Sequence, residues 1–209
     1  MSYDRFDRFL PLAGVLAGLL FSVQLVLLWN HPKGETGPAE TFAYWQDDRG
    51  QHQIVAILVV PLIAFFLIFF GAGVRRRLAQ GGDAGHGSVA FGGALLGAAG
   101  FLIVAMLEAG MTNAAHESEQ QTVYTLNQFH SYHWLASNAA FAAMLLAAGL
   151  GARRNGMLPT RLAWVTIAIG ASLLTPLGWF GFYLIPVWLI VVGVWLFLRT
   201  PTLPEPIPS

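Results

Sequence analysis

The chain has 209 residues, of which 56% are hydrophobic and 11% are charged, and its formal net charge is zero. Soluble domains carry about 25% charged residues, so this composition excludes an ordinary water-soluble protein. Cysteine is absent, which excludes disulfides, thiolate metal sites, iron–sulfur clusters and cysteine nucleophiles.

Apolar stretches of bilayer length recur along the chain. A membrane-spanning helix needs about 20 apolar residues, and the sequence predicts six such helices, at residues 9–29, 54–74, 89–110, 132–150, 162–177 and 180–198. The first stretch is longer than a signal-peptide core and is expected to stay uncleaved. The fifth is short, and the turn at residues 175–178 joins it to the sixth as a helical hairpin, either a tilted spanning pair or a re-entrant one. We therefore predict an all-α polytopic membrane protein, a single six-helix bundle over residues 1–209.

The positive charges are distributed unevenly between the predicted loops. Cytoplasmic loops retain Lys and Arg, and nine of the 11 basic residues fall on one side: Arg5, Arg8, Arg75, Arg76, Arg77, Arg153, Arg154, Arg161 and Arg199. Only Lys33 and Arg49 fall on the other side. This asymmetry and the even number of spans both place the two termini in the cytoplasm, and the protein in the cell membrane.

Two long loops lie on the predicted external side. Pro38 in the first turn and Gly50 as a stop predict a short surface helix at about residues 38–48. Ser118 with Gln121 three residues later matches a capping box, so the fourth helix is expected to begin near Glu119 and to project above the bilayer.

Small residues one turn apart predict close helix packing, and prolines inside spans predict kinks. The small pairs are Gly14 with Gly18, Gly93 with Gly97, and Ala143 with Ala147; the prolines are Pro61 and Pro186. The small pairs are expected to pack within the bundle, although they also permit a homo-oligomer or a membrane-protein partner.

Several short motifs resemble those of uncharacterised six-helix bacterial membrane proteins of the domain-of-unknown-function type. They are Pro38-Ala39-Glu40 to Tyr44, Asp48-Arg49-Gly50, Gly156-Met157-Leu158-Pro159, Leu162-Ala163-Trp164 and Thr175-Pro176-Leu177-Gly178. The resemblance implies architecture only and brings no activity, cofactor or catalytic residue.

One polar cluster is the candidate site. Glu108 lies in the outer turn of the third predicted span, where a carboxylate is costly unless it is paired or faces water. His130, His133 and Ser137 are spaced along one face of the fourth helix, so Glu108 and His133 are expected to meet. Asn113, Asn127, Asn138 and Gln24 add polar groups at similar depth.

Three interpretations of this cluster remain open. A Glu–His hydrogen bond could pin two helices together, as in a structural accessory subunit of a membrane complex. The outer helix halves could line a vestibule for a small or lipid-like ligand, with Glu108, His130, His133, Ser137, Asn138 and Gln24 as binding residues. A membrane enzyme or metal-binding protein could hold a divalent ion with His130, His133 and Glu108.

Other cofactors and partners are disfavoured. Haem sits between histidines deep in the bilayer, whereas none of the six histidines lies deep in a predicted span. A retinal-type chromophore is excluded because Lys33, the only lysine, is in an external loop. The arginines are explained by membrane orientation, so nucleic-acid binding has no basis. Binding or sensing of a ligand from outside is the predicted function, and whether any reaction is catalysed stays open.

Overall fold

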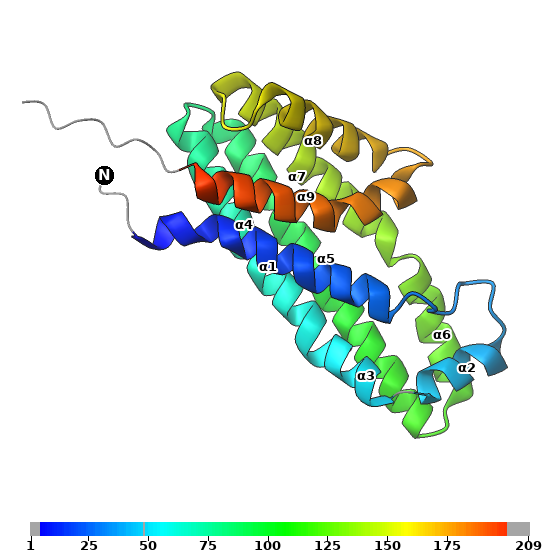
Figure 1. Cartoon of the computed structure of the whole chain (residues 1–209). Helices are drawn as coiled ribbons and strands as arrows, with labels where there is room; N and C mark the ends of the chain where they lie inside the picture. The colour runs from blue at the N-terminus through cyan, green and yellow to red at the C-terminus, as the bar shows by residue number, and fades with distance from the viewer. Residues whose placement is uncertain (1–4, 48, 200–209) are drawn as a thin grey trace, which may run out of the picture.

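A computed structural model describes residues 5–47 and 49–199, and every regular element in these two ranges is helical. Five long helices make up most of the fold (Figure 1): α1 (Arg5–Leu27), α4 (Val60–Gln80), α5 (Ala84–His116), α7 (His133–Asn155) and α9 (Gly178–Leu198). The shorter elements are α2 (Pro38–Gln46), α3 (Arg49–Ile54), the π-helix η1 (Val55–Val59), α6 (Gln120–Ser131) and α8 (Thr160–Ser172). The predicted all-α class is confirmed.

Five helical stretches of the described residues are long and apolar enough to cross a membrane, at residues 8–27, 49–80, 84–116, 120–155 and 178–198. These correspond to five of the six predicted spans. The fifth predicted span is instead the 13-residue α8, which is about 20 Å long and shorter than a hydrocarbon core. The prediction of one helix over residues 162–177 was too long because Pro176 cannot donate to a helix and disfavours helical backbone at Thr175.

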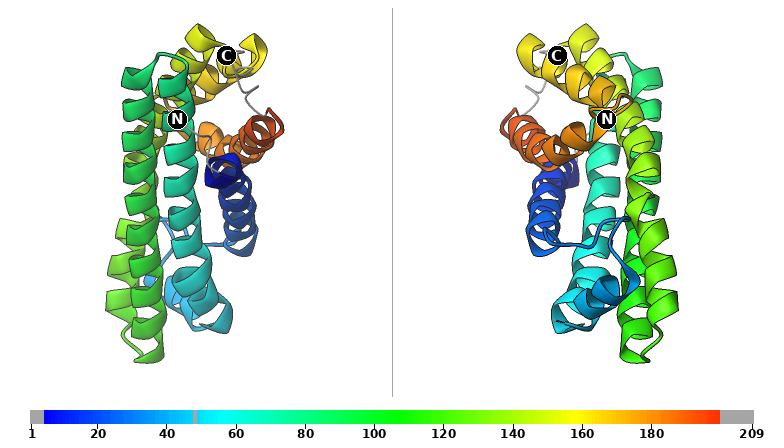
Figure 2. Two further views of the ribbon diagram at one scale, coloured as in Figure 1. Left: turned by 90° about the vertical axis from the view of Figure 1, so that its left-hand side faces the viewer. Right: turned by 90° about the vertical axis from the view of Figure 1, so that its right-hand side faces the viewer.

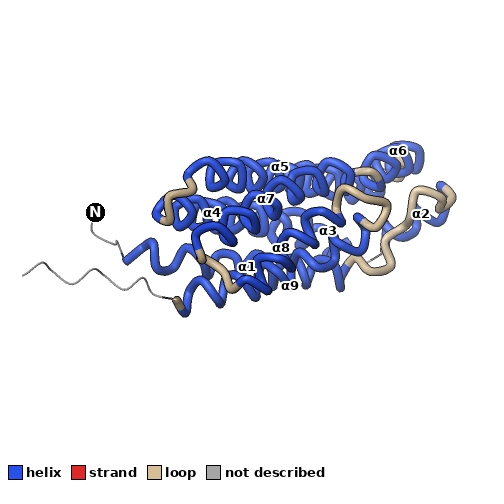
Figure 3. The backbone as a smooth tube through the Cα atoms, turned by 90° about the horizontal axis from the view of Figure 1, so that it is seen from above, coloured by secondary structure: helices blue, strands red, loops and turns tan. Residues whose placement is uncertain are grey.

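The long helices α4, α5 and α7 run along one another, and α1, α8 and α9 lie at an angle to them (Figures 1 and 3). The start of α1 and the end of α9 lie together at one end, where Phe9 and Phe197 are 6.2 Å apart between ring centroids. The turns after α4 and α7 lie at the same end, which we call the arginine end because Arg75–Arg77, Arg153 and Arg154 precede these turns. At the opposite end, α2, α3 and α6 surround the outer part of α5 (Figure 2). We call this the α2/α6 end.

The helices differ in length, and this difference shapes the α2/α6 end. The 33 residues of α5 extend about 50 Å, and α3, η1 and α4 together form a stretch of similar length. The 23-residue α1 and the 21-residue α9 are shorter, so α4 and α5 continue past them (Figure 2). The part of α5 beyond the end of α1 and the start of α9 is therefore not packed against these two helices.

Glycines allow the long helices to approach backbone to backbone. A Cβ atom on Gly93 of α5 would lie 2.5 Å from the backbone nitrogen of Met144 in α7. A Cβ atom on Gly18 of α1 would lie 2.6 Å from the carbonyl oxygen of Pro186 in α9. These positions are among the small residues for which packing within the bundle is predicted from the sequence.

Three local breaks interrupt the regular helices, and a kink at one of them, Pro61, is predicted from the sequence. Pro61 follows a π-helical turn, since its ring and missing N–H would disrupt a regular α-helix there. Tyr132 separates α6 from α7, so the predicted continuous fourth helix is interrupted. Ser118 has a φ of 63° and no capping hydrogen bond, so the predicted capping box is wrong, and Glu119 is the residue that precedes α6.

Candidate functional site

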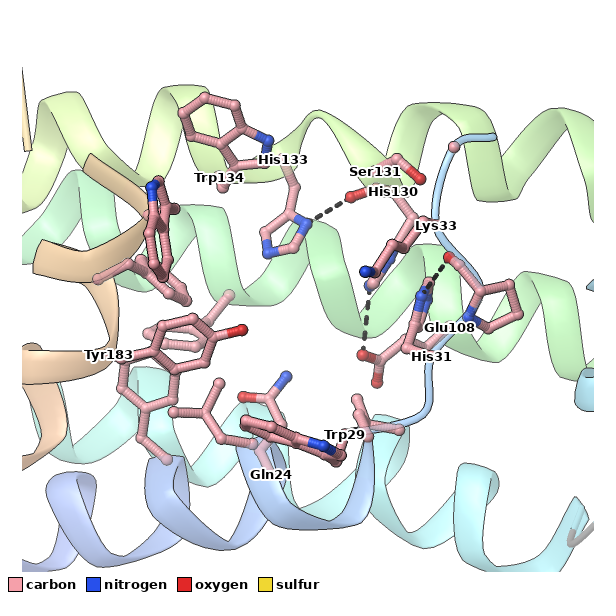
Figure 4. Close-up of a pocket in the computed structure, with 18 residues that line it drawn as sticks. Gln24, Trp29, His31, Lys33, Glu108, His130, Ser131, His133, Trp134 and Tyr183 are labelled. Atoms are coloured by element: carbon pink, nitrogen blue, oxygen red, sulfur yellow. Dashed lines mark hydrogen bonds and ion pairs between the residues drawn. The ribbon is translucent and has the colours of Figure 1, made fainter. Parts of the chain in front are cut away.

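A pocket of about 340 Å³ lies where α1 ends and α9 begins. Its walls come from α1, the following loop at residues 28–34, α5, the junction of α6 with α7, and the first turns of α9 (Figure 4). The predicted vestibule between the third and fourth helices is therefore one wall of a pocket that α1 and α9 complete.

Glu108 is buried in this pocket. The residue is 1% exposed, and neither carboxylate oxygen accepts a hydrogen bond from the described residues. The Nε2 atom of His130 lies 3.4 Å from Glu108 Oε1 (Figure 4). Placing a carboxylate in such an environment is costly unless a donor or a cation reaches it.

The ring of His31 stacks on that of His130, with ring centroids 4.4 Å apart and an interplanar angle of 20°. Its Nδ1 atom lies 2.7 Å from the carbonyl oxygen of Pro32. Because a carbonyl oxygen only accepts, Nδ1 carries the hydrogen and Nε2 is left as an acceptor. Burial, together with the neighbouring His130 ring, lowers the pKa of His31 to about 3, so this imidazole is neutral at physiological pH.

His133 points into the pocket from the first residue of α7 (Figure 4). Its Nδ1 atom contacts the carbonyl oxygen of His130, so Nδ1 donates and, in the neutral ring, Nε2 accepts. Gln24 of α1 lines the pocket from the opposite wall, with its amide directed inward (Figure 4). Four of the six predicted binding residues are thus brought together: Glu108, His130, His133 and Gln24.

The other two predicted binding residues lie elsewhere. Ser137 is buried against Gly100 of α5, since its Oγ atom would lie 3.1 Å from a Cβ atom built there. Asn138 is buried beside Gly178, at the start of α9. Both residues lie further along α7 than His133 and Trp134, which line the pocket. The break at Tyr132 separates His130 from His133, so the helical face predicted for them is not continuous. His130 lies 3.4 Å from Glu108, and His133 is also close enough to interact with the carboxylate electrostatically.

Comparison of the chain with protein-family models, curated proteins and solved structures finds no match. The function must therefore be argued from the site itself. Within residues 5–47 and 49–199, no group of three or more His, Cys, Asp or Glu side chains has an arrangement that could hold a metal ion. The set His130, His133 and Glu108 does not form such a group.

Aromatic side chains form the remaining wall of the pocket. Trp29 of the loop after α1 and Tyr183 of α9 contribute rings whose centroids are 6.3 Å apart. Trp134, Trp179 and Phe182 also line it. Nothing in the sequence indicates that these aromatic residues share a cavity with Glu108.

A second layer of rings supports the histidines from the α2/α6 end. Trp45 of α2 is 1% exposed, and its ring centroid lies 5.5 Å from that of His31 and 4.8 Å from that of His52. Its Nε1 atom donates to Asn127 Oδ1 of α6 at 3.5 Å. Burial and the charge of Glu108 raise the pKa of the Tyr44 hydroxyl to about 12. The loop after α1, α2 and α3 thus form a packed cover over the carboxylate.

Proposed function

We propose that this chain is a six-span protein of the cytoplasmic membrane that binds or senses a small or lipid-like molecule in the pocket around Glu108. In this proposal the arginine end lies in the cytoplasm and the pocket opens at the outer surface. The resemblance to six-helix bacterial membrane proteins of unknown function belongs to the same proposal.

The path of the chain supports six crossings. The end of α7 lies at the arginine end, whereas α9 begins beside the pocket and returns to the arginine end (Figure 1). The chain must therefore pass back along the bundle between Asn155 and Gly178. The helix α8, extended by the turn at residues 173–177, makes that passage. The concentration of Lys and Arg at one end then favours a cytoplasmic location for that end.

The observation that carries the binding proposal is a buried carboxylate in a cavity of ligand size: its oxygens accept no hydrogen bond from the described residues, and the His130 ring lies 3.4 Å away. Pockets for small molecules enclose about 300–1,000 Å³ and are mostly apolar, with a few polar groups that orient the ligand. Here the described walls provide aromatic rings and a small polar set, and Glu108 has 1% exposure and no hydrogen bond to either oxygen.

The orientation can be tested with two engineered cysteines in this cysteine-free chain. A Cβ atom at Gly37 or at Gly85 would meet no atom within 4 Å, so both positions tolerate a side chain. We expect a membrane-impermeant maleimide added to intact cells to label Gly37→Cys, and to label Gly85→Cys only after the cells are opened. The reverse pattern would contradict the proposed orientation.

The binding proposal can be tested by filling the pocket. Leu28 lines the pocket, whereas its neighbour Leu27 does not. We expect protein purified in a mild detergent to retain an amphiphile from the host lipid extract, detectable by native mass spectrometry. Leu28→Trp should lose this adduct and Leu27→Trp should keep it. If both variants retain the same adduct as the wild type, the pocket is not the binding site.

A further inference from the structure

We infer that the pocket recognises the primary ammonium group of an amphiphile, such as an aminoethyl phospholipid headgroup or an alkylamine. This inference rests on the proposed function, because it names the ligand class of the same pocket. It follows from the hydrogen-bonding character of the groups around Glu108, from the position of the one lysine, and from the aromatic wall.

The polar floor of the pocket offers acceptors. Glu108 contributes two carboxylate oxygens, both without a hydrogen bond to the described residues. His31 contributes Nε2, which is also buried and without a partner in that part of the chain, because Nδ1 donates to the Pro32 carbonyl. His133 presents its own Nε2 for the same reason. A primary ammonium group has three donors and no acceptor, so it complements this arrangement.

A positive charge is also required. A buried carboxylate is stabilised by a cation within hydrogen-bonding reach. His31 cannot supply that charge at physiological pH, because its pKa is lowered to about 3 by burial and by its neighbour His130. Lys33 is the only lysine of the chain and lies in the loop that lines the pocket, but its side chain is exposed. From there it is suited to an anionic phosphate outside the cavity.

The aromatic wall suits the remainder of such a ligand. Trp29 and Tyr183 face the pocket beside Gln24 (Figure 4), and rings within about 6 Å of a cation attract it. Trp179 and Tyr183 are 60% and 44% exposed, so they continue the apolar surface out of the pocket. A volume of about 340 Å³ holds a headgroup and not two acyl chains, which would lie along these exposed rings.

The test compares headgroups on one detergent-solubilised protein by native mass spectrometry. The probes are phosphatidylethanolamine, phosphatidylcholine and phosphatidylglycerol with identical acyl chains, together with dodecylamine as a free amine. A charge-assisted hydrogen bond contributes about 1.5–3 kcal/mol, so we expect phosphatidylethanolamine to bind on the order of tenfold more tightly than phosphatidylglycerol. Phosphatidylcholine has no N–H donor and should bind more weakly than phosphatidylethanolamine.

The variants separate the role of Glu108 from a general effect of charge. Glu108→Gln should abolish the preference for the ammonium headgroup, whereas Glu117→Gln, which alters an exposed carboxylate outside the pocket, should leave it intact. If Lys33→Met weakens binding of the three phospholipids but not of dodecylamine, Lys33 contacts the phosphate and the ammonium assignment stands. If dodecylamine binds only after Lys33→Met, Lys33 is the native partner of Glu108 and the inference is overturned.

The outcomes also distinguish this inference from the proposed function. Equal binding of all headgroups that is still lost in Leu28→Trp would leave a lipid-binding pocket but overturn the ammonium assignment. Binding that neither Leu28→Trp nor Glu108→Gln changes would overturn both. Glu108→Gln protein that does not fold would be replaced by Glu108→Asp, which should retain the preference for ammonium with reduced affinity.

Discussion

Replacing Gly93 with alanine should separate α5 from α7 and destabilise the protein. The added Cβ atom would lie 2.5 Å from the backbone nitrogen of Met144 and 2.7 Å from the carbonyl oxygen of Ala140. Normal carbon contacts are about 3.5–4.0 Å, so the two backbones must move apart by about 1 Å. Neither atom belongs to a side chain that could rotate away, and overpacking of this kind costs about 1–3 kcal/mol.

The neighbouring residue provides a matched control. A Cβ atom on Gly92 would meet nothing within 4 Å, and both glycines lie within the same helix. Gly92→Ala should therefore gain up to about 1 kcal/mol from helix propensity alone. The two variants should differ by about 2–3 kcal/mol in the free energy of unfolding, with Gly93→Ala the less stable.

Reversible unfolding in mixed detergent and SDS micelles, followed by tryptophan fluorescence, measures this difference. If the free energies of unfolding of Gly92→Ala and Gly93→Ala agree within about 0.5 kcal/mol, the close approach of α5 to α7 is wrong. The placement of Glu108 beside His130 would then lose its support, because α5 and the α6–α7 segment hold these two residues.

Three further predictions test other parts of the structure. The pKa of His31 is lowered to about 3 in the folded protein, whereas the unfolded chain binds this proton near pH 6.5, so the stability that His31 contributes should be complete above pH 6.5 and should fall as the pH drops toward 3. His31→Gln should therefore flatten the fall in melting temperature between pH 7 and 5. An unchanged slope would contradict a buried neutral imidazole. Trp45→Ala should cost about 3–5 kcal/mol and expose the segment at residues 34–47 to limited proteolysis, whereas wild-type cleavage rates would show that α2 is not packed by Trp45. Thr166→Val should cost about 1–3 kcal/mol in the same unfolding assay, because the Nε1 atom of Trp188 donates to Thr166 Oγ1 at 2.8 Å. Thr166→Ser keeps the hydroxyl and should retain the stability. Equal losses in the two variants would argue against the hydrogen bond.

The sequence predicts the membrane-crossing helices well, because transfer of apolar side chains into hydrocarbon depends mainly on composition. It predicts their ends poorly. The apolar stretch of the third span stops at Gly110, yet α5 continues to His116, since a helix needs no further apolar residues once it packs on other helices outside the bilayer. The fifth predicted helix was too long for a local reason, the proline at position 176.

The candidate site could also be predicted only in part. Glu108 could be identified because a carboxylate in an apolar stretch is rare and costly. The arrangement of the two imidazoles around it could not be predicted, since the prediction assumed an uninterrupted helix and the break at Tyr132 alters the alignment of the rings. His31 was missed because nothing in its local sequence indicates that the loop after α1 folds back onto His130.

The π-helical turn η1 rotates α3 relative to α4 within one continuous helical stretch. It adds a residue to the turn before Pro61, and each residue of an α-helix corresponds to about 100° of rotation. Removing one residue from Val55–Val59 would restore regular pitch and leave α4 in place, but it would swing α3 around its axis. The ring of His52, now 4.8 Å from that of Trp45, would then face away from the carboxylate that α2 and α3 cover.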